Sequence, residues 1–211
     1  MDIFWRKTDL VPNPLGRGDS PESAAETIQA AAGIGLAGCS LEDHTGRRDD
    51  PIYDFTLAVE RIEAAVEARR SLSHDFVLTA RCENFLWGRP DLGDTILRLQ
   101  AFERAGADVL YAPGLNDLST IRLVCEAVTK PVNIVMGMPG ATFGVSELAQ
   151  VGVKRISVGS ALARPSFGLF VNAARECDQQ APSASQSRLW DSRSWRDCSP
   201  ARRRHEKSRN S

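Results

Sequence analysis

The chain has 211 residues, of which 42% are hydrophobic and 25% charged, and its formal net charge is −1 at pH 7. Such a composition suits one soluble globular domain, or one domain with a tail. The near-neutral charge excludes attraction to nucleic acid or membranes by the field of the whole molecule. No apolar run reaches the roughly 18–20 residues of a membrane span, and the first ten residues lack the core of a secretory signal. Because its five cysteines are widely spaced and form no CxxC, we expect reduced thiols in a cytoplasmic protein.

Helices and strands are predicted to alternate along most of the chain, after an irregular segment at 1–19. Ser20 and Pro21 are typical of a helix start, and Gly106 of a helix stop. The clearest helix, at 55–70, carries apolar residues at a 3.6-residue period. Predicted helices cover 21–32, 55–70, 91–105, 116–128, 145–150 and 164–176, and predicted strands cover 34–41, 76–80, 108–112, 132–136 and 155–158.

This alternation predicts right-handed βαβ units and a parallel sheet in an α/β domain at 20–176. The strand spacing fits a (β/α)-barrel as well as an open doubly wound sheet. No GxGxxG follows the first strand and no GxxxxGK[ST] occurs, which argues against a dinucleotide fold and a P-loop. Residues 177–211 are rich in Ser and Arg and are predicted to be a disordered tail. Their basic residues could touch nucleic acid, but a solvated tail is the favoured interpretation.

Polar residues follow the predicted strands at their carboxyl ends, where parallel α/β folds bind ligands. Glu42 and Asp43 are hard oxygen ligands that suit Mg²⁺. Arg81 offers a planar fork for a carboxylate or phosphonate, and Glu83 could orient Arg81 or transfer a proton. Asn133 could bind a second anionic or carbonyl oxygen. Together these groups suit an α-keto acid whose enolate develops during the reaction.

Each of these residues also has a structural interpretation. The carboxylate pair could be solvated or cap a helix, Asp43 could form only an ion pair, and His44 is more typical of a loop. Arg81 could simply pair with Glu83 or Glu42. Two cysteines beside the strands, Cys39 and Cys82, are expected to be small core residues. Gly159 begins a Gly-Ser-Ala stretch that could bind phosphate through backbone amides or form a tight turn.

Four segments resemble the isocitrate lyase / phosphoenolpyruvate mutase superfamily: GLAGCSLEDHTG, FVLTARCENFLWGRPDLGDTILRLQAFERAGADVLYAPGLNDLSTIR, KPVNIVMGMPG and VGVKRISVGSALAR. The resemblance covers about 19–176. It implies a (β/α)8 TIM-type barrel that uses Mg²⁺, or Mn²⁺ as an alternative. It also implies chemistry on a small α-keto acid such as oxaloacetate or phosphonopyruvate. By the same resemblance Glu42 is a metal-shell residue, Arg81 binds substrate, and Asn133 contacts it.

The sequence also departs from that family. A Lys-Lys-Cys-Gly-His loop with a catalytic cysteine is replaced by residues 47–53 without cysteine, so cleavage of isocitrate or methylisocitrate by that route is not expected. The metal-binding aspartates before Gly18 are absent. The first two strands and an exchanged C-terminal helix have no counterpart. We therefore expect an incomplete barrel of about five to six βα units, in a truncated reading frame or a fragment completed by another subunit.

Two functional hypotheses follow from these observations. The first is a Mg²⁺-dependent lyase or phosphonomutase-like enzyme that stabilises an enolate, with activity impaired by truncation. The second is a non-catalytic remnant of the barrel with a binding role or none. A homo-oligomer is compatible with either hypothesis, whereas nucleic acid and membrane partners are not expected.

Overall fold

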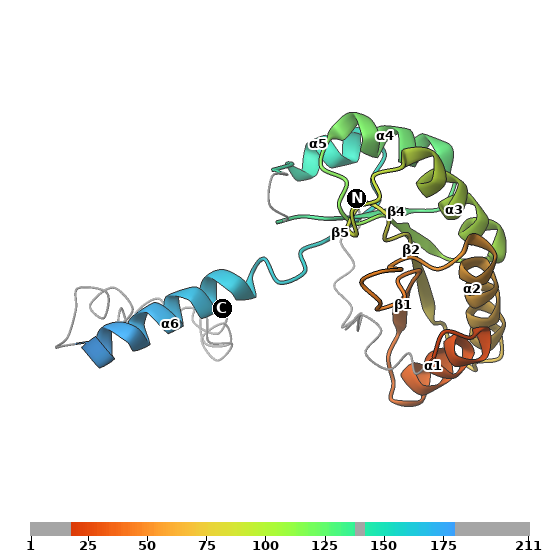
Figure 1. Cartoon of the computed structure of the whole chain (residues 1–211), viewed down its shortest axis with the longest axis horizontal. Coiled ribbons are helices and arrows are strands. Elements are labelled where there is room, and N and C mark those ends of the chain that lie inside the picture. Colours follow the sequence, from red (N-terminus) through yellow and green to blue (C-terminus); the bar gives the residue numbers. More distant parts are fainter. Residues whose placement is uncertain (1–17, 138–141, 180–211) are drawn as a thin grey trace, which may run out of the picture. The chain divides into compact units, whose positions relative to one another are not determined.

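A computed structural model describes residues 18–137 and 142–179 of the chain (Figure 1). The described elements are α1 (Pro21–Gly33), β1 (Gly38–Glu42), α2 (Phe55–Arg70), β2 (Val77–Arg81), α3 (Leu92–Ala105), β3 (Val109–Tyr111), α4 (Leu118–Ala127), β4 (Val132–Val135), α5 (Val145–Gln150), β5 (Arg155–Ser157) and α6 (Ala163–Gln179). The chain divides after Gly159 into two units, so that α6 belongs to the second unit and the other elements belong to the first. Every helix and strand predicted from the sequence is therefore present.

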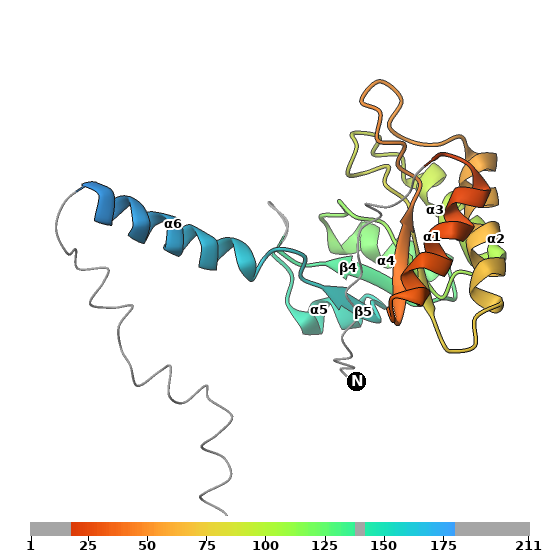
Figure 2. The same ribbon diagram turned by 90° about the horizontal axis from the view of Figure 1, so that it is seen from below.

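The five described strands form one parallel sheet in the order β1-β2-β3-β4-β5. Each strand pairs with its sequence neighbour, as consecutive right-handed βαβ units require. Figure 1 shows α1 to α4 in an arc outside the strands, and Figure 2 shows α1 and α2 side by side. None of the helices in residues 18–137 and 142–179 is long and apolar enough to cross a membrane.

The two faces of the sheet differ in polarity. One face packs against the helices through fully or nearly fully buried side chains, which are Cys39, Leu41, Leu78, Ala80, Leu110, Val132 and Ile134. Because side chains alternate along a strand, the residues between them point to the opposite face, where Ser40, Thr79 and Asn133 are buried polar groups. The buried Cys39 and Cys82 are core residues, as predicted. Burial also raises the pKa of both thiols.

The helix ends follow the predicted chemistry. Ser20 accepts a hydrogen bond from the amide of Ser23, with Pro21 at the first helical position of α1. Asp117 caps α4 by accepting from the amide of Thr120 at 2.7 Å. Gly106 ends α3 with a φ of 108°, in the left-handed region that glycine adopts without strain.

The first strand differs from the prediction at both of its ends. The segment predicted as strand 34–41 becomes strand only at Gly38 and continues to Glu42. The amides of Ile34 and Gly35 donate instead to Ala30 and Ala32 carbonyls, which closes the last turn of α1. Gly35 supplies the positive φ, 84°, that this turn needs. The shift brings Glu42 into the sheet.

A buried ion pair joins the end of β1 to α3. Asp43 and Arg98 are 2% and 6% exposed, and Arg98 Nη1 lies 3.2 Å from Asp43 Oδ2. The other Asp43 oxygen accepts from the amide of Glu83 at 2.8 Å, and Arg98 also pairs with Asp94 at 2.7 Å. Burial raises the pKa of Asp43 to about 6 against the opposing effects of the Glu83 amide and Arg98. Both charges are therefore compensated, and the pair fixes the loop after β1.

Gly38 is expected to tolerate no side chain. A Cβ there would lie 2.5 Å from the carbonyl oxygen of Val77 on the paired strand, so Gly38→Ala should lower the free energy of unfolding by about 1–3 kcal/mol. Gly33→Ala is the control, because a Cβ there meets no atom within 4 Å, and alanine in a helix should add about 0.5–1 kcal/mol. Urea titration measures both variants, and equal stabilities would contradict the prediction.

Two substitutions in α3 test the contribution of the Asp43–Arg98 pair to stability. Arg98→Met leaves Asp43 buried without its cation and should destabilise the chain by about 3–5 kcal/mol. The exposed Arg104 of α3 provides the matched control, and Arg104→Met should change stability by no more than about 0.5 kcal/mol. If thermal and urea unfolding show similar losses for both variants, the pair is not a main support of the fold.

Candidate functional site

A row of five side chains crosses the sheet on the face opposite the helices. The strand register pairs Glu42 with Arg81, Arg81 with Tyr111, Tyr111 with Asn133, and Asn133 with Arg155. Register-paired residues of parallel strands point to the same face, so these five residues form one continuous line, here called the polar row. Glu42, Arg81 and Tyr111 end their strands, at the carboxyl edge where α/β folds bind ligands, whereas Arg155 begins β5.

Arg81 lies between two carboxylates. Its Nη1 is 2.8 Å from Glu42 Oε1, and its Nη2 and Nε both lie 2.8 Å from Glu83 Oε1. The guanidinium carbon also lies 4.9 Å from the centre of the Tyr111 ring. The predicted pairing of Arg81 with Glu83 or Glu42 is therefore present with both partners at once. These contacts hold a planar fork in one orientation on the polar face.

Glu83 is a nearly fully buried carboxyl beside this fork, 1% exposed. Burial raises its pKa to about 7, and the positive charge of Arg81 opposes this shift only in part. Its second oxygen accepts from Trp87 Nε1 at 3.3 Å, and the Trp87 ring stacks on His44 at 3.9 Å between centroids. Burial lowers the pKa of His44. The site therefore contains a carboxyl group that changes charge near neutral pH.

Asn133 is held from both ends of its amide. Its Nδ2 donates to Ser157 Oγ at 3.1 Å, and its Oδ1 accepts from Arg155 Nη1 at 2.8 Å. Arginine can only donate hydrogen bonds, so the amide orientation is fixed by Arg155. Asn133 is itself fully buried. The structure thus brings Asn133 into the same row as Glu42 and Arg81, as the ligand-site hypothesis requires.

The remaining predicted site residues lie apart from this row. Asp43 points into the ion pair with Arg98, so the two adjacent carboxylates face different surroundings. Gly159 follows β5 at the end of the first unit with a φ of 49°. Residues 138–141, which follow the predicted strand 132–136, lie outside the described part of the chain. The roles of Asp43 as a metal ligand and of Gly159 in substrate binding stay predictions.

Sequence reasoning missed three members of this site: Tyr111, Arg155 and Trp87. Tyr111 and Arg155 were assigned to strands, but their face depends on the register between strands. The alternation of Arg155 with the apolar Ile156 was the available signal, because it places Arg155 and Ser157 on one face.

A single carboxylate of the polar row is suited to Mg²⁺. Glu42 is 19% exposed at its side chain and can offer an oxygen at the edge of the sheet. Both oxygens of Asp43 already accept hydrogen bonds. Within residues 18–137 and 142–179, no three His, Cys, Asp or Glu side chains are grouped to hold a metal ion. Glu42 can therefore supply one ligand to a Mg²⁺ ion, and the described residues do not supply a complete set of ligands.

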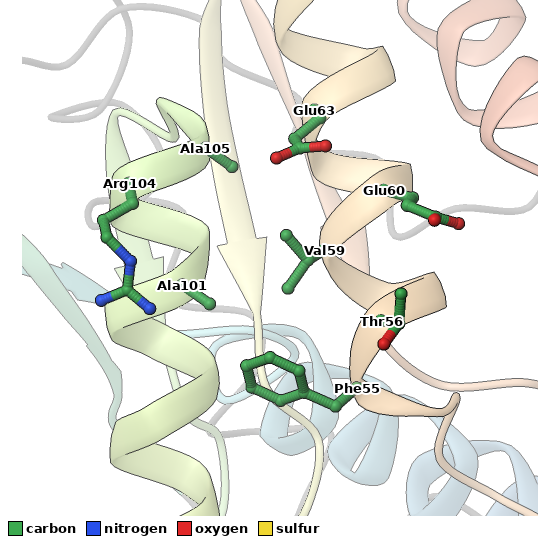
Figure 3. A pocket seen from close by; sticks show the side chains of 8 residues that line it. All are labelled: Phe55, Thr56, Val59, Glu60, Glu63, Ala101, Arg104 and Ala105. Atoms are coloured by element: carbon green, nitrogen blue, oxygen red, sulfur yellow. The ribbon is translucent and has the colours of Figure 1, made fainter.

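A groove of about 390 Å³ lies elsewhere, between α2 and α3 (Figure 3). Its walls combine Phe55 and Val59 with charged side chains such as Glu63 and Arg104. None of the polar row lines this groove, which belongs to the helix layer. The polar row is therefore the better candidate for chemistry.

Comparisons with known proteins show the family of the chain. The sequence model of the phosphoenolpyruvate phosphomutase family matches residues 15–177. The chain is 32% identical over 152 residues to 2-methylisocitrate lyase of Escherichia coli, covering 68% of this chain and 50% of that protein. It is 32% identical over 171 residues to oxaloacetate decarboxylase of Paraburkholderia xenovorans, covering 78% and 54%. The chain thus spans about half the length of these curated relatives.

A solved structure from Burkholderia cenocepacia, assigned to a lyase or mutase, is also similar. It is 51% identical with a TM-score of 0.80, and the match covers 87% of this chain and 66% of that one. The parallel sheet is therefore of the (β/α)8-barrel type expected from the resemblance, with five of its strands in the described residues. The match along most of the sequence and the shared fold lead to one conclusion: the chain belongs to the phosphoenolpyruvate phosphomutase family, in the isocitrate lyase / phosphoenolpyruvate mutase superfamily.

Proposed function

We propose that the chain binds a small 2-oxo acid at the polar row and acts as a lyase or phosphonomutase-like enzyme. The observation that carries this proposal is Arg81, which is held by Glu42 and Glu83 on the polar face of the sheet. Oxaloacetate and phosphonopyruvate are the substrates that we propose. The curated relatives, a 2-methylisocitrate lyase and an oxaloacetate decarboxylase, support this class.

Arg81 would bind the carboxylate next to the keto group. A guanidinium presents parallel N–H donors that match the two oxygens of a carboxylate. Its two acidic partners fix this fork before a ligand arrives, which reduces the ordering that binding requires. The Asn133 amide, oriented by Arg155, would donate its second N–H to the keto oxygen. Donors aimed at this oxygen stabilise the negative charge of an enolate.

Glu83 would transfer a proton. A catalytic acid or base works best with a pKa near the operating pH, and burial brings that of Glu83 to about 7. Its position beside Arg81 places it next to the group that would hold the substrate carboxylate. Trp87 and Arg81 hold its two oxygens and so orient the carboxyl group.

Glu42 would contribute one carboxylate to a Mg²⁺ or Mn²⁺ site. A divalent ion there would supply stabilisation of the charge on the enolate oxygen. Mg²⁺ keeps several waters and takes only one or two carboxylates in many proteins, so a single Glu42 oxygen is compatible with binding. Gly159 as a substrate-binding residue, homo-oligomer formation and a cytoplasmic location also remain part of this proposal.

Substitution of Arg81 tests the function directly. Arg81→Met should lower turnover of oxaloacetate or phosphonopyruvate with Mg²⁺ by on the order of 100-fold or more. The exposed Arg122 of α4 gives the matched control, and Arg122→Met should keep full activity. Steady-state assays of the purified full chain measure this loss.

A thermal-shift assay with Mg²⁺ and oxalate, an enolate mimic, accompanies these assays. Stabilisation of the full chain that Arg81→Met abolishes would support the proposed site, because a ligand that binds the native state raises its stability. Equal turnover in the two variants would refute the role of Arg81. Absence of both turnover and stabilisation would favour the alternative, a non-catalytic member of the family.

The titration of Glu83 predicts a pH dependence of stability. Its native pKa of about 7 exceeds the ordinary 4.5, so the native state holds this proton more tightly than the unfolded chain does. The resulting stabilisation is complete below pH 4.5 and is lost as the pH rises to about 7. Glu83→Gln has no such titration. Between pH 4.5 and about 7, its free energy of unfolding should therefore rise by a few kcal/mol relative to that of the wild type.

Urea unfolding at several pH values checks this prediction. Glu63→Gln, on the exposed face of α2, is the matched control and should differ from wild type by the same amount at every pH. A constant difference between Glu83→Gln and wild type would show that Glu83 has the same pKa in the native and the unfolded state, and would contradict the prediction.

A further inference from the structure

Arg155 is the last member of the polar row and has an unusual environment. It begins β5 and is half-buried, and its Nη1 donates to Asn133 Oδ1 at 2.8 Å. Its position opposite Asn133 in the register places it on the same face as Arg81. The face therefore carries two guanidinium groups, one at the end of the row and one near its start.

The two arginines differ in how their charges are compensated. Arg81 meets the carboxylates of Glu42 and Glu83, and the buried Arg98 meets those of Asp43 and Asp94. Among the described residues, no carboxylate lies within ion-pair distance of Arg155. The guanidinium of Arg155 instead donates to a neutral amide oxygen, and burial lowers the pKa of Arg155. A partly desolvated cation without a counter-ion is costly, so this position favours an anion.

The two guanidinium groups lie on either side of the middle of the polar row. Arg81 on β2 leans over the Tyr111 ring on β3, at 4.9 Å, while Arg155 on β5 reaches Asn133 on β4. Their strands are three positions apart, or roughly 14 Å between backbones at about 4.8 Å for each strand spacing. Tyr111 and Asn133 lie between them in the row, so the two guanidinium groups flank the space above β3 and β4.

We propose that Arg155 binds the second anionic group of a dianionic 2-oxo acid, so that the site selects a distal carboxylate or phosphonate over an uncharged tail. This inference rests on the proposed function, in which Arg81 holds the carboxylate beside the keto group. Arg155 then determines the specificity for the distal group of the substrate. Its hydrogen bond to Asn133 would keep its guanidinium group near the keto oxygen.

A purely structural role for Arg155 makes a different prediction. If Arg155 only orients the Asn133 amide, any donor at this position serves equally well and every 2-oxo acid depends on it to the same extent. Glutamine separates the two roles, because it keeps an N–H donor for Asn133 Oδ1 but carries no charge. Lysine keeps the charge and loses the planar fork.

The test compares phosphonopyruvate with 2-oxobutyrate, in which a methyl group replaces the phosphonate. Calorimetric titration of the full chain with Mg²⁺ should show tighter binding of phosphonopyruvate. Arg155→Gln should weaken phosphonopyruvate binding by about tenfold or more while changing 2-oxobutyrate binding less than about twofold. Arg155→Lys should retain part of the preference. Arg122→Gln on the exposed face of α4 should leave both affinities unchanged.

Each result decides between the roles. Equal weakening of both ligands by Arg155→Gln would assign Arg155 to positioning Asn133 and overturn the inference. Unchanged affinities in that variant would overturn it as well, while leaving the proposed function intact. If the wild-type chain binds neither ligand, the proposed function fails and the inference falls with it. Thermal melting confirms folding of each variant, and Arg155→Lys replaces Arg155→Gln if the latter does not fold.

Discussion

The parallel register of the five strands is the constraint on which the site depends. It sends apolar side chains such as Leu78 and Leu110 toward the helices, and it aligns polar ones on the other face. Burial of the apolar face stabilises the sheet by about 25 cal/mol for each Å² removed from water. A slip of one residue in any strand would turn its polar residue into this core. The energy that holds the fold therefore also holds the polar row in line.

The buried charged groups next to the polar row form a chain of contacts from α3 to Arg81. Asp43 binds the backbone amide of Glu83 on one side and Arg98 of α3 on the other. Glu83 in turn holds Arg81, which also meets Glu42 on the polar face. Each carboxylate is costly to bury alone, and each is compensated by the next group. The charged chain thus connects the outer helix layer to the group that would bind substrate.

The sequence predicted the elements well because their causes are local. Apolar runs, a helical period at 55–70, and caps such as Ser20 depend on neighbouring residues only. Glu42 and Arg81 were found because strand ends can be identified along the chain. The place of Arg155 in the site was not predicted, because its face depends on the pairing of β5 with β4. The Asp43–Arg98 contact was not predicted either, because it joins residues 55 positions apart. The adjacent Glu42 and Asp43 look equivalent in sequence but face the polar row and α3, respectively.

The charge of the polar row links ligand binding to proton uptake. With Glu83 ionised, two carboxylates, Glu42 and Glu83, contact the single cation Arg81, and with Glu83 protonated one carboxylate and one cation remain. The pKa of about 7 puts these two forms close in free energy at neutral pH. An anion held between the arginines, as we propose, repels an ionised Glu83 and so raises its pKa further. Substrate binding would therefore favour the protonated carboxyl, which places the proton beside the keto acid when an enolate needs it.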